Sequence, residues 1–338
     1  MKGTTRMTIA RRALALFGLA GGLLLGGAAA AADKVTLRTN WLFYGSHAIF
    51  FLGIDKGFYE REGIDLVVKQ GNGSGNAVRL VANKDSTFAY ASAVTMLNLA
   101  AQGAPVVAVA TIDAQGTDAV LVDPDSGIKT FKDLEGKNVL TTAGAGVNTL
   151  FPVVARNAGA DPEKIKLTYV AESALVSSYL QKLAPAMLGG IDDKPAEIKA
   201  AGGKPPLIFN YADYGVSQPG YAIVAHREMV EKNPDLVRRF VRATLRSVAA
   251  AKADPDAAIR ALINWQASVE DQKAQAREVL DVTLSILRSK NAKDDRLGVN
   301  VPEDWDAALE ILKTYKELKT DKPASAFYTN DFVPASLN

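Results

Sequence analysis

Short apolar runs alternate with longer amphipathic segments from Val35 onwards. Such runs predict strands, and segments whose apolar residues recur every three or four positions predict helices. The strands predicted in the first part of the chain are 35–39, 64–69, 87–90 and 106–112. The helices predicted between them are 46–56, 76–82 and 92–102. Repeated strand–helix units of this kind are typical of a mostly parallel sheet with helices on both faces.

The same rhythm starts again after a turn at residues 123–127, where Pro124 and Gly127 punctuate the chain. The strands predicted there are 138–142, 166–170, 184–188 and 206–210. Three helices are predicted there: one that the glycine turn at 144–146 opens and that ends at 158, and two that span 173–181 and 192–201. The pattern indicates a second α/β unit of similar size.

The chain beyond the β-rich run 220–226 is almost entirely helical in pattern, and a cap residue precedes proline at Pro234 and Pro255. We expect this helical tail to pack on a unit already formed. The predicted fold class is therefore α/β, with two lobes of mostly parallel sheets, flanking helices and a helical C-terminal tail. Residues 33–118 with 217–338 form lobe I and 119–216 form lobe II, with crossings near 117–119 and 211–219.

The first 32 residues have the pattern of an export signal. Lys2, Arg6, Arg11 and Arg12 precede an apolar run at 13–25, and small residues lead up to a cleavage site near Ala32. Arg11 and Arg12 are either ordinary charges of this region or part of a twin-arginine signal. The alternative is a membrane anchor, but the run is shorter than the ~20 residues that a span needs. We expect a periplasmic protein with its leader removed.

Charge and rare residues exclude several functions. The chain has 39 basic and 37 acidic residues, and the leader holds four of the basic ones, so the remainder is slightly acidic. This balance does not favour nucleic-acid binding. With no cysteine and two histidines, His47 and His226, a disulfide, a thiol nucleophile and a histidine metal site are not expected. We expect no cofactor and no catalysis.

Glycine-rich turns follow a strand and precede a helix in both halves. Gly71, Gly73 and Gly75 surround Ser74, and Gly144 and Gly146 precede Asn148. Each turn is either a tight structural turn or a place where backbone and side chains contact a ligand. Position 76 is asparagine, so the first turn lacks the third glycine of a dinucleotide-binding fingerprint.

Aromatic and polar residues gather where predicted strands end, which is where open α/β sheets bind ligands. Trp41 is expected to line a pocket, with Tyr44 and His47 in the same turn and Tyr211 and Tyr214 at the second crossing. Ser92 either caps its own helix or donates to a ligand. The remaining candidates are acidic residues that are either solvated or bind an amine: Glu172, Asp192 and Asp193.

These motifs resemble the type II periplasmic solute-binding proteins of ABC importers, in the branch that binds thiamine-pyrimidine precursors, nitrate, sulfonates and taurine. The motifs are Asn40-Trp41, His47-Ala48, Lys56-Gly57-Phe58-Tyr59, Glu62-Gly63-Ile64-Asp65, Gly73-Ser74-Gly75 and Asn233-Pro234. The resemblance implies a monomeric receptor that closes on a small ligand and docks on a membrane permease and its ATPase. It implies that Trp41 and Tyr214 flank a flat ring, with His47, Ser74, Ser92 and Asn148 near its polar edges.

One departure affects the ligand. Relatives commonly carry Asn-Glu before the proline at position 195, where this chain has Asp193-Lys194. The carboxylate that reads an aminopyrimidine is then moved to Asp192 or Asp193, or lost. A thiamine-precursor pyrimidine is the favoured ligand, and a sulfonate, taurine or nitrate is the alternative. From other classes, a pyrimidine-synthase-like enzyme and a ligand sensor are the alternatives.

Overall fold

A computed structural model describes residues 31–143, 145, 147–216, 218–316 and 318–337. The predicted leader up to residue 30 and the two glycines of the 144–146 opening lie outside this part. None of the helices in the described ranges is both long and apolar enough to cross a membrane.

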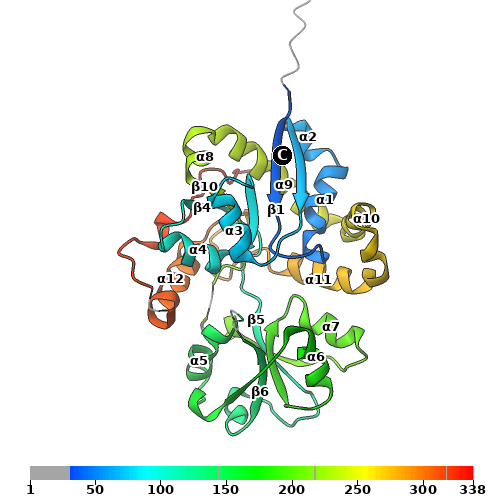
Figure 1. Ribbon diagram of the computed structural model, residues 1–338, viewed down its shortest axis with the longest axis vertical. Coiled ribbons are helices and arrows are strands. Elements are labelled where there is room, and N and C mark those ends of the chain that lie inside the picture. The colour runs from blue at the N-terminus through cyan, green and yellow to red at the C-terminus, as the bar shows by residue number, and fades with distance from the viewer. Residues whose placement is uncertain (1–30, 144, 146, 217, 317, 338) are drawn as a thin grey trace, which may run out of the picture. The chain divides into compact units, whose positions relative to one another are not determined.

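The first sheet has five strands in the order β2-β1-β3-β10-β4 (Figure 1). Its strands are β1 (Asp33–Arg38), β2 (Ile64–Lys69), β3 (Phe88–Ser92), β4 (Val106–Thr111) and β10 (Tyr221–His226). Strand β10 runs antiparallel to both of its neighbours, and the other pairings are parallel. Every residue of β4 is buried, as its continuous apolar run predicts for a strand covered on both faces.

The second sheet repeats this plan in the order β7-β6-β8-β5-β9. Its strands are β5 (Asp118–Val122), β6 (Asn138–Thr142), β7 (Lys166–Val170), β8 (Ala186–Gly190) and β9 (Leu207–Asn210). Strand β5 is antiparallel to both β8 and β9. Strand β5 differs from the prediction, which places a crossing between the lobes at residues 117–119; residues 119–122 form a buried part of this strand.

Helices cover both faces of the first sheet. They are α1 (Ala48–Asp55), α2 (Phe58–Arg61), α3 (Ser74–Ala82), α4 (Ala93–Ala101), α8 (Arg227–Lys232), α9 (Pro234–Ala253), α10 (Pro255–Trp265), α11 (Lys273–Ser285) and α12 (Pro302–Lys316). Around the second sheet lie α5 (Val147–Asn157), α6 (Glu172–Leu180) and α7 (Lys194–Ala200) (Figure 1). Short 3-10 turns are η1 (Gly45–His47), η2 (Phe131–Leu134), η3 (Pro162–Lys164), η4 (Tyr211–Tyr214), η5 (Ala267–Gln272) and η6 (Ala324–Ala326).

Each face of the first sheet has its own hydrophobic core. On one face Phe240 of α9 stacks on Phe88 of β3, with ring centroids 4.0 Å apart and 5° between the planes. On the other face Trp305 of α12 is fully buried with residues of α3 and α4. The helical tail therefore completes the first sheet's cores, as predicted.

Two expectations about the tail differ in outcome. Asp254 caps α10 by accepting a hydrogen bond from the Ala257 amide at 2.9 Å, whereas Asn233 occupies the cap position of α9 without such a bond. Both Trp265 and Trp305 have helical spacing that predicts core positions. Trp265 is instead 53% exposed, because its Nε1 reaches out to Asp55 at 3.0 Å while its ring covers Phe51.

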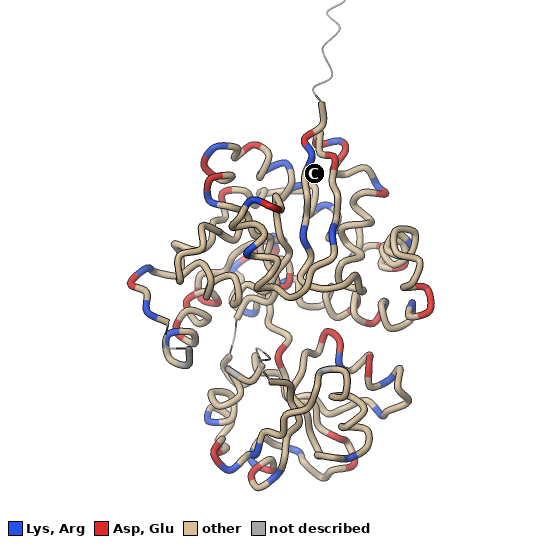
Figure 2. Tube along the Cα trace, in the orientation of Figure 1, with Lys and Arg blue, Asp and Glu red and all other residues tan. Residues whose placement is uncertain are grey.

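Acidic and basic residues are interspersed along the described chain in both halves (Figure 2). Many are paired: Arg239, for example, binds both Asp33 and Asp235 at 2.7 Å. This pattern agrees with the nearly balanced composition of the chain.

Candidate ligand-binding site

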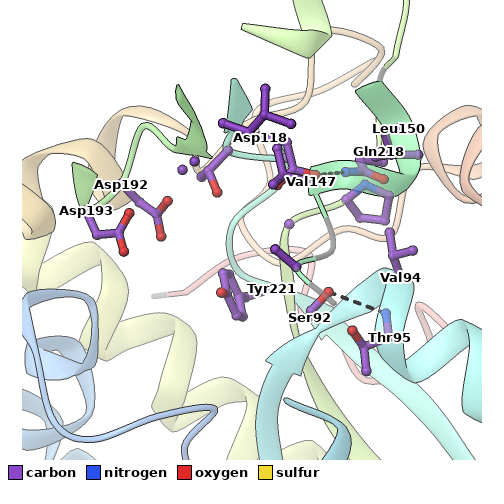
Figure 3. Close-up of a pocket in the computed structure, with 18 of the residues that line it drawn as sticks. Ser92, Val94, Thr95, Asp118, Val147, Leu150, Asp192, Asp193, Gln218 and Tyr221 are labelled. Carbon is purple, nitrogen blue, oxygen red and sulfur yellow. Dashed lines mark hydrogen bonds between the residues drawn. The ribbon is translucent and has the colours of Figure 1, made fainter. Parts of the chain in front are cut away.

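A cavity of about 480 Å³ lies where strands of both sheets end. Figure 3 shows Ser92, Asp118, Asp192, Asp193 and Tyr221 around it. The parallel strands β3, β6 and β8 reach it with their carboxyl ends, which is the edge where open α/β sheets bind ligands. The antiparallel strands β5 and β10 reach it with their first residues, Asp118 and Tyr221.

Asp118 and Gln218 join the two segments that connect the sheets. The Gln218 Nε2 donates to Asp118 Oδ2 at 3.2 Å, and the Gly116 amide donates to the Gln218 carbonyl at 2.8 Å. Burial raises the pKa of Asp118 to about 6, and the bond from Gln218 opposes this shift only in part. Gln218 is 6% exposed, and its buried Oε1 has no hydrogen-bond partner among the described residues.

Asp192 and Asp193 occupy the turn between β8 and α7. Burial raises the pKa of Asp192, the charge of Asp193 adds to the shift, and a hydrogen bond from Thr117 opposes it. The Asp192 carboxylate folds back over Gly190, where a Cβ would come within 2.2 Å of Asp192 Oδ1. Both carboxylates line the cavity.

Lys194 is the one basic side chain among the described lining residues. It is only 7% exposed, and its Nζ lies 3.1 Å from Glu197 Oε1 and 3.2 Å from Asp193 Oδ2. The ammonium is therefore already neutralised by carboxylates of its own helix and turn.

Tyr221 lines the cavity from the first sheet, and Tyr90 packs behind it. The Tyr221 ring stacks on Tyr90, with centroids 5.0 Å apart, and the Tyr90 hydroxyl donates to Asp113 Oδ2 at 2.9 Å. Burial raises the pKa of Asp113 to about 8, and the charge of Asp192 adds to the shift. Burial likewise raises the pKa of Tyr221, with further contributions from Tyr44, Asp192 and Asp113. The contributions of Asp192 to both pKa values indicate that the acidic turn of the second sheet lies near Tyr221 and Asp113.

The Asn40–His47 turn packs against Tyr90, with the His47 and Tyr90 ring centroids 5.7 Å apart. The fully buried His47 donates from Nε2 to Asn40 Oδ1 at 2.7 Å, and its Nδ1 accepts from the Tyr44 amide at 3.4 Å. The Asn40 Nδ2 donates to the Tyr44 hydroxyl at 3.3 Å. Burial lowers the pKa of His47 to about 3, so the imidazole is neutral. None of these three is among the residues that line the cavity.

Trp41 and the first glycine turn are held by their backbones. The Gly71 amide donates to the Trp41 carbonyl at 3.0 Å, and the Gly73 amide donates to the Asn40 carbonyl at 2.7 Å. A Cβ at Gly71 would lie 1.8 Å from the Thr39 carbonyl oxygen, so this position requires glycine. The Trp41 side chain is 50% exposed and does not line the cavity in this structure.

Ser74 and Ser92 connect this turn to the cavity. Ser74 Oγ accepts a hydrogen bond from the Ser92 amide at 3.0 Å. Ser92 Oγ accepts from the Thr95 amide at 3.4 Å, so Ser92 caps α4 while also lining the cavity (Figure 3). The two alternatives for Ser92 are thus compatible with each other.

The remaining candidates lie in the second half of the chain. Asn148 bonds the Thr142 carbonyl at 2.8 Å and accepts from Thr141. The buried Tyr211 hydroxyl donates to the Val147 carbonyl at 3.3 Å. Tyr214 packs edge-on against Phe131, with ring centroids 4.7 Å apart. None of these three is among the lining residues. Glu172 begins α6, and its side chain lies outside the described residues.

The structure therefore brings Ser92, Asp192 and Asp193 together, and adds Asp118, Gln218 and Tyr221, which the sequence analysis did not single out. A polar residue directly before the apolar run 119–122 was the signal available for Asp118. Within the described ranges, no cluster of histidine or carboxylate side chains is arranged to hold a metal ion.

Two α/β sheets with one antiparallel strand each, and a polar cavity where their strands end, define the class of type II periplasmic binding folds. A solved representative is the aliphatic sulphonate binding protein SsuA from Escherichia coli, which shares this fold with a TM-score of 0.67 and 15% identity, over 88% of this chain and 91% of that one. The predicted fold class is confirmed.

The chain belongs to the NMT1/THI5-like family, whose sequence pattern matches residues 45–258. It is 23% identical over 307 residues to riboflavin-binding protein RibY of Chloroflexus aurantiacus, covering 89% of this chain and 86% of that protein. It is also 23% identical to a formylaminopyrimidine-binding protein of Halalkalibacterium halodurans, over 86% and 87% of the two chains. A Legionella pneumophila 4-amino-5-hydroxymethyl-2-methylpyrimidine phosphate synthase is 23% identical over 89% and 93%. The family contains binding proteins and proteins named as synthases.

Proposed function

We propose that this protein is a periplasmic receptor that captures a small polar heteroaromatic solute and delivers it to an ABC importer. A thiamine-precursor pyrimidine is the favoured solute. The observation that carries the proposal is the cavity of about 480 Å³ with carboxylate, amide and aromatic lining at the strand ends. Sites for small organic ligands have volumes of roughly 300–1,000 Å³ and a few converging polar groups.

The chemistry of the lining supports a ligand with a hydrogen-bond donor edge over an anion. Asp192 and Asp193 offer acceptors where the relatives' Asn-Glu pair is missing, and Tyr221 offers a flat ring face. Sulfonate and nitrate need donors or positive charge, and Lys194 is already bound to Glu197. The alternative ligands sulfonate, taurine and nitrate are therefore less favoured than an aminopyrimidine.

Transport requires export and two lobes that close. We propose that the leader is cleaved near Ala32, and that residues 33–118 with 217–338 close against residues 119–216 over the ligand. Closure of this kind would bring the half-exposed Trp41 onto the ligand as an additional wall. We propose that the receptor then docks as a monomer on a membrane permease that works with an ATPase.

Calorimetry and thermal-shift assays with aminopyrimidines, riboflavin, alkanesulfonates, taurine and nitrate test the proposal. A true ligand at a hundredfold excess over its Kd should stabilise the protein by ~2.7 kcal/mol. The absence of stabilisation by every solute at millimolar concentration would overturn the receptor function. Chemical conversion of a bound solute, followed by mass spectrometry, would favour the synthase alternative.

Trp41→Ala tests the role of closure. The variant should weaken ligand binding at least about tenfold and change the free energy of unfolding by less than about 0.5 kcal/mol, because the side chain is half exposed. Leu42→Ala is the matched control, since Leu42 is the adjacent side chain and is 57% exposed. Equal affinity in Trp41→Ala and the parent protein would remove Trp41 from the site.

A further inference from the structure

The cavity has an excess of carboxylic acids over basic groups among its described lining residues. Asp118, Asp192 and Asp193 line it, and Lys194 is the one described basic group that faces them. Because Glu197 also contacts the Lys194 ammonium at 3.1 Å, this cation cannot neutralise the three lining carboxylates. Full ionisation of the empty cavity would leave negative charges close together and partly removed from water.

A second observation also indicates a donor-bearing ligand. The Nε2 of Gln218 donates to Asp118, and its Oε1 is buried without a hydrogen-bond partner among the described residues. A buried acceptor without a donor destabilises the protein, so a ligand that donates to it would recover this loss. The exposed part of the Tyr221 ring adds a surface to which cations are attracted.

We propose that this cavity selects a cationic solute and that the carboxyl groups release protons to solvent when that solute binds. The inference rests on the proposed receptor function and specifies the charge of its ligand. A ligand cation replaces protons as the counter-charge of Asp118 and Asp192. No covalent bond to the ligand forms, and each proton released goes to the buffer.

The surroundings of both groups are consistent with this exchange. Burial holds the pKa of Asp118 at about 6, beside Gln218 and near Tyr211. Burial and Asp193 raise the pKa of Asp192. The titratable and charged groups around Asp192, from both sheets, are Tyr44, Asp113, Asp118, Asp193, Lys194 and Tyr221. An opposite charge within a few ångströms lowers a carboxyl pKa, so cation binding favours proton release.

Matched probes that differ in charge test the inference. Nicotinamide, which is neutral, and 1-methylnicotinamide, which is a permanent cation of nearly the same shape, form the first pair. Any solute that binds in the panel described above is measured together with its N-methylated cationic analogue. The cation should bind at least about tenfold more tightly at pH 8, since one unit of coupling in a carboxyl pKa equals a tenfold change in affinity.

Proton release is measured by calorimetry of the unmodified protein in two buffers of different ionisation enthalpy. Cation binding near pH 6 should release a measurable fraction of a proton, and the Kd should fall as pH rises from about 5 to 8. Asp192→Asn should weaken cation binding about tenfold and reduce proton release, while neutral probes change little. Asp65→Asn, an exposed position on β2, is the control and should leave both quantities unchanged.

The outcomes separate this inference from the proposed function. Binding of neutral or anionic solutes as tightly as their cationic analogues, or cation binding without proton release, would overturn the inference and leave the receptor function intact. The absence of binding by every probe would remove both. The calorimetric measurement needs no variant, so a folding defect in Asp192→Asn would not decide the result.

Discussion

The ionisation of Asp118 gives a quantitative prediction for the ligand-free protein. Burial raises the pKa of this carboxyl from 3.8 to about 6. A group whose pKa is raised in the folded state binds its proton more tightly there than in the unfolded chain. Its ionisation therefore destabilises the protein as pH rises through this interval, and the full penalty is present above about pH 7.

Asp118→Asn removes the charge and keeps an oxygen that accepts from Gln218, as in the parent bond of 3.2 Å. Two pKa units correspond to about 3 kcal/mol at ~1.36 kcal/mol each. Asp118 is partly accessible to water, which reduces this value. We expect the variant to be about 1–3 kcal/mol more stable than the parent at pH 8, and equal to it near pH 3.5.

Urea unfolding of the ligand-free protein at several pH values, followed by circular dichroism, measures this difference. Asp65→Asn should show a small change with little pH dependence, because its carboxyl is exposed. A variant that is less stable at pH 8, or a difference that does not change with pH, would refute the reasoning. The gain in stability should accompany weaker cation binding, as is common when a strained binding site is relieved.

Three further substitutions test the architecture. Glu62→Gln should cost about 1–3 kcal/mol at neutral pH, because Glu62 accepts two bonds from Arg242 that lower its pKa; the difference should vanish as pH falls well below 4.5 in urea titrations. Phe240→Ala should lower the free energy of unfolding by about 3–5 kcal/mol, because removal of the buried ring that stacks on Phe88 leaves a cavity. A loss below about 1 kcal/mol would contradict this packing. Trp305→Ala should cost a similar amount in the same unfolding assay, and an unchanged Tm would show that its burial is not needed.

Much of the fold is predictable from the sequence because buried strands are short apolar runs. Strands β2, β6 and β7 begin and end at the predicted residues, since turn residues or charges bound these runs on both sides. Strand β5 was missed because the apolar run 119–122 follows a loop without a preceding helix. The repeated strand–helix rhythm therefore gave no reason to expect a strand there.

The lining of the cavity was predictable only in part, because the rule that ligands bind at the carboxyl ends of strands applies to parallel strands. Ser92, Asp192 and Asp193 follow the carboxyl ends of β3 and β8 and do line the cavity. Asp118 and Tyr221 begin β5 and β10, and the amino end of an antiparallel strand lies at the same edge. That placement depends on strand direction, which local sequence does not specify.

Aromatic residues show the other limit of sequence reasoning. His47 and Tyr211 are residue types expected in a ligand site, but each is buried and forms a hydrogen bond with another part of the chain. Ring-rich turns therefore predict both packing and binding, and only the three-dimensional surroundings of each side chain separate the two.

The bond between Gln218 and Asp118 has a consequence for how the ligand preference of this fold can change. Asp118 begins β5 and Gln218 lies shortly before β10, and neither belongs to the hydrophobic core clusters of the two sheets. Substitutions at them change the charge that the cavity presents while the strands and helices keep their packing. The charge of the ligand that such a fold accepts can therefore be altered at a few positions beside the cavity, while the architecture stays the same.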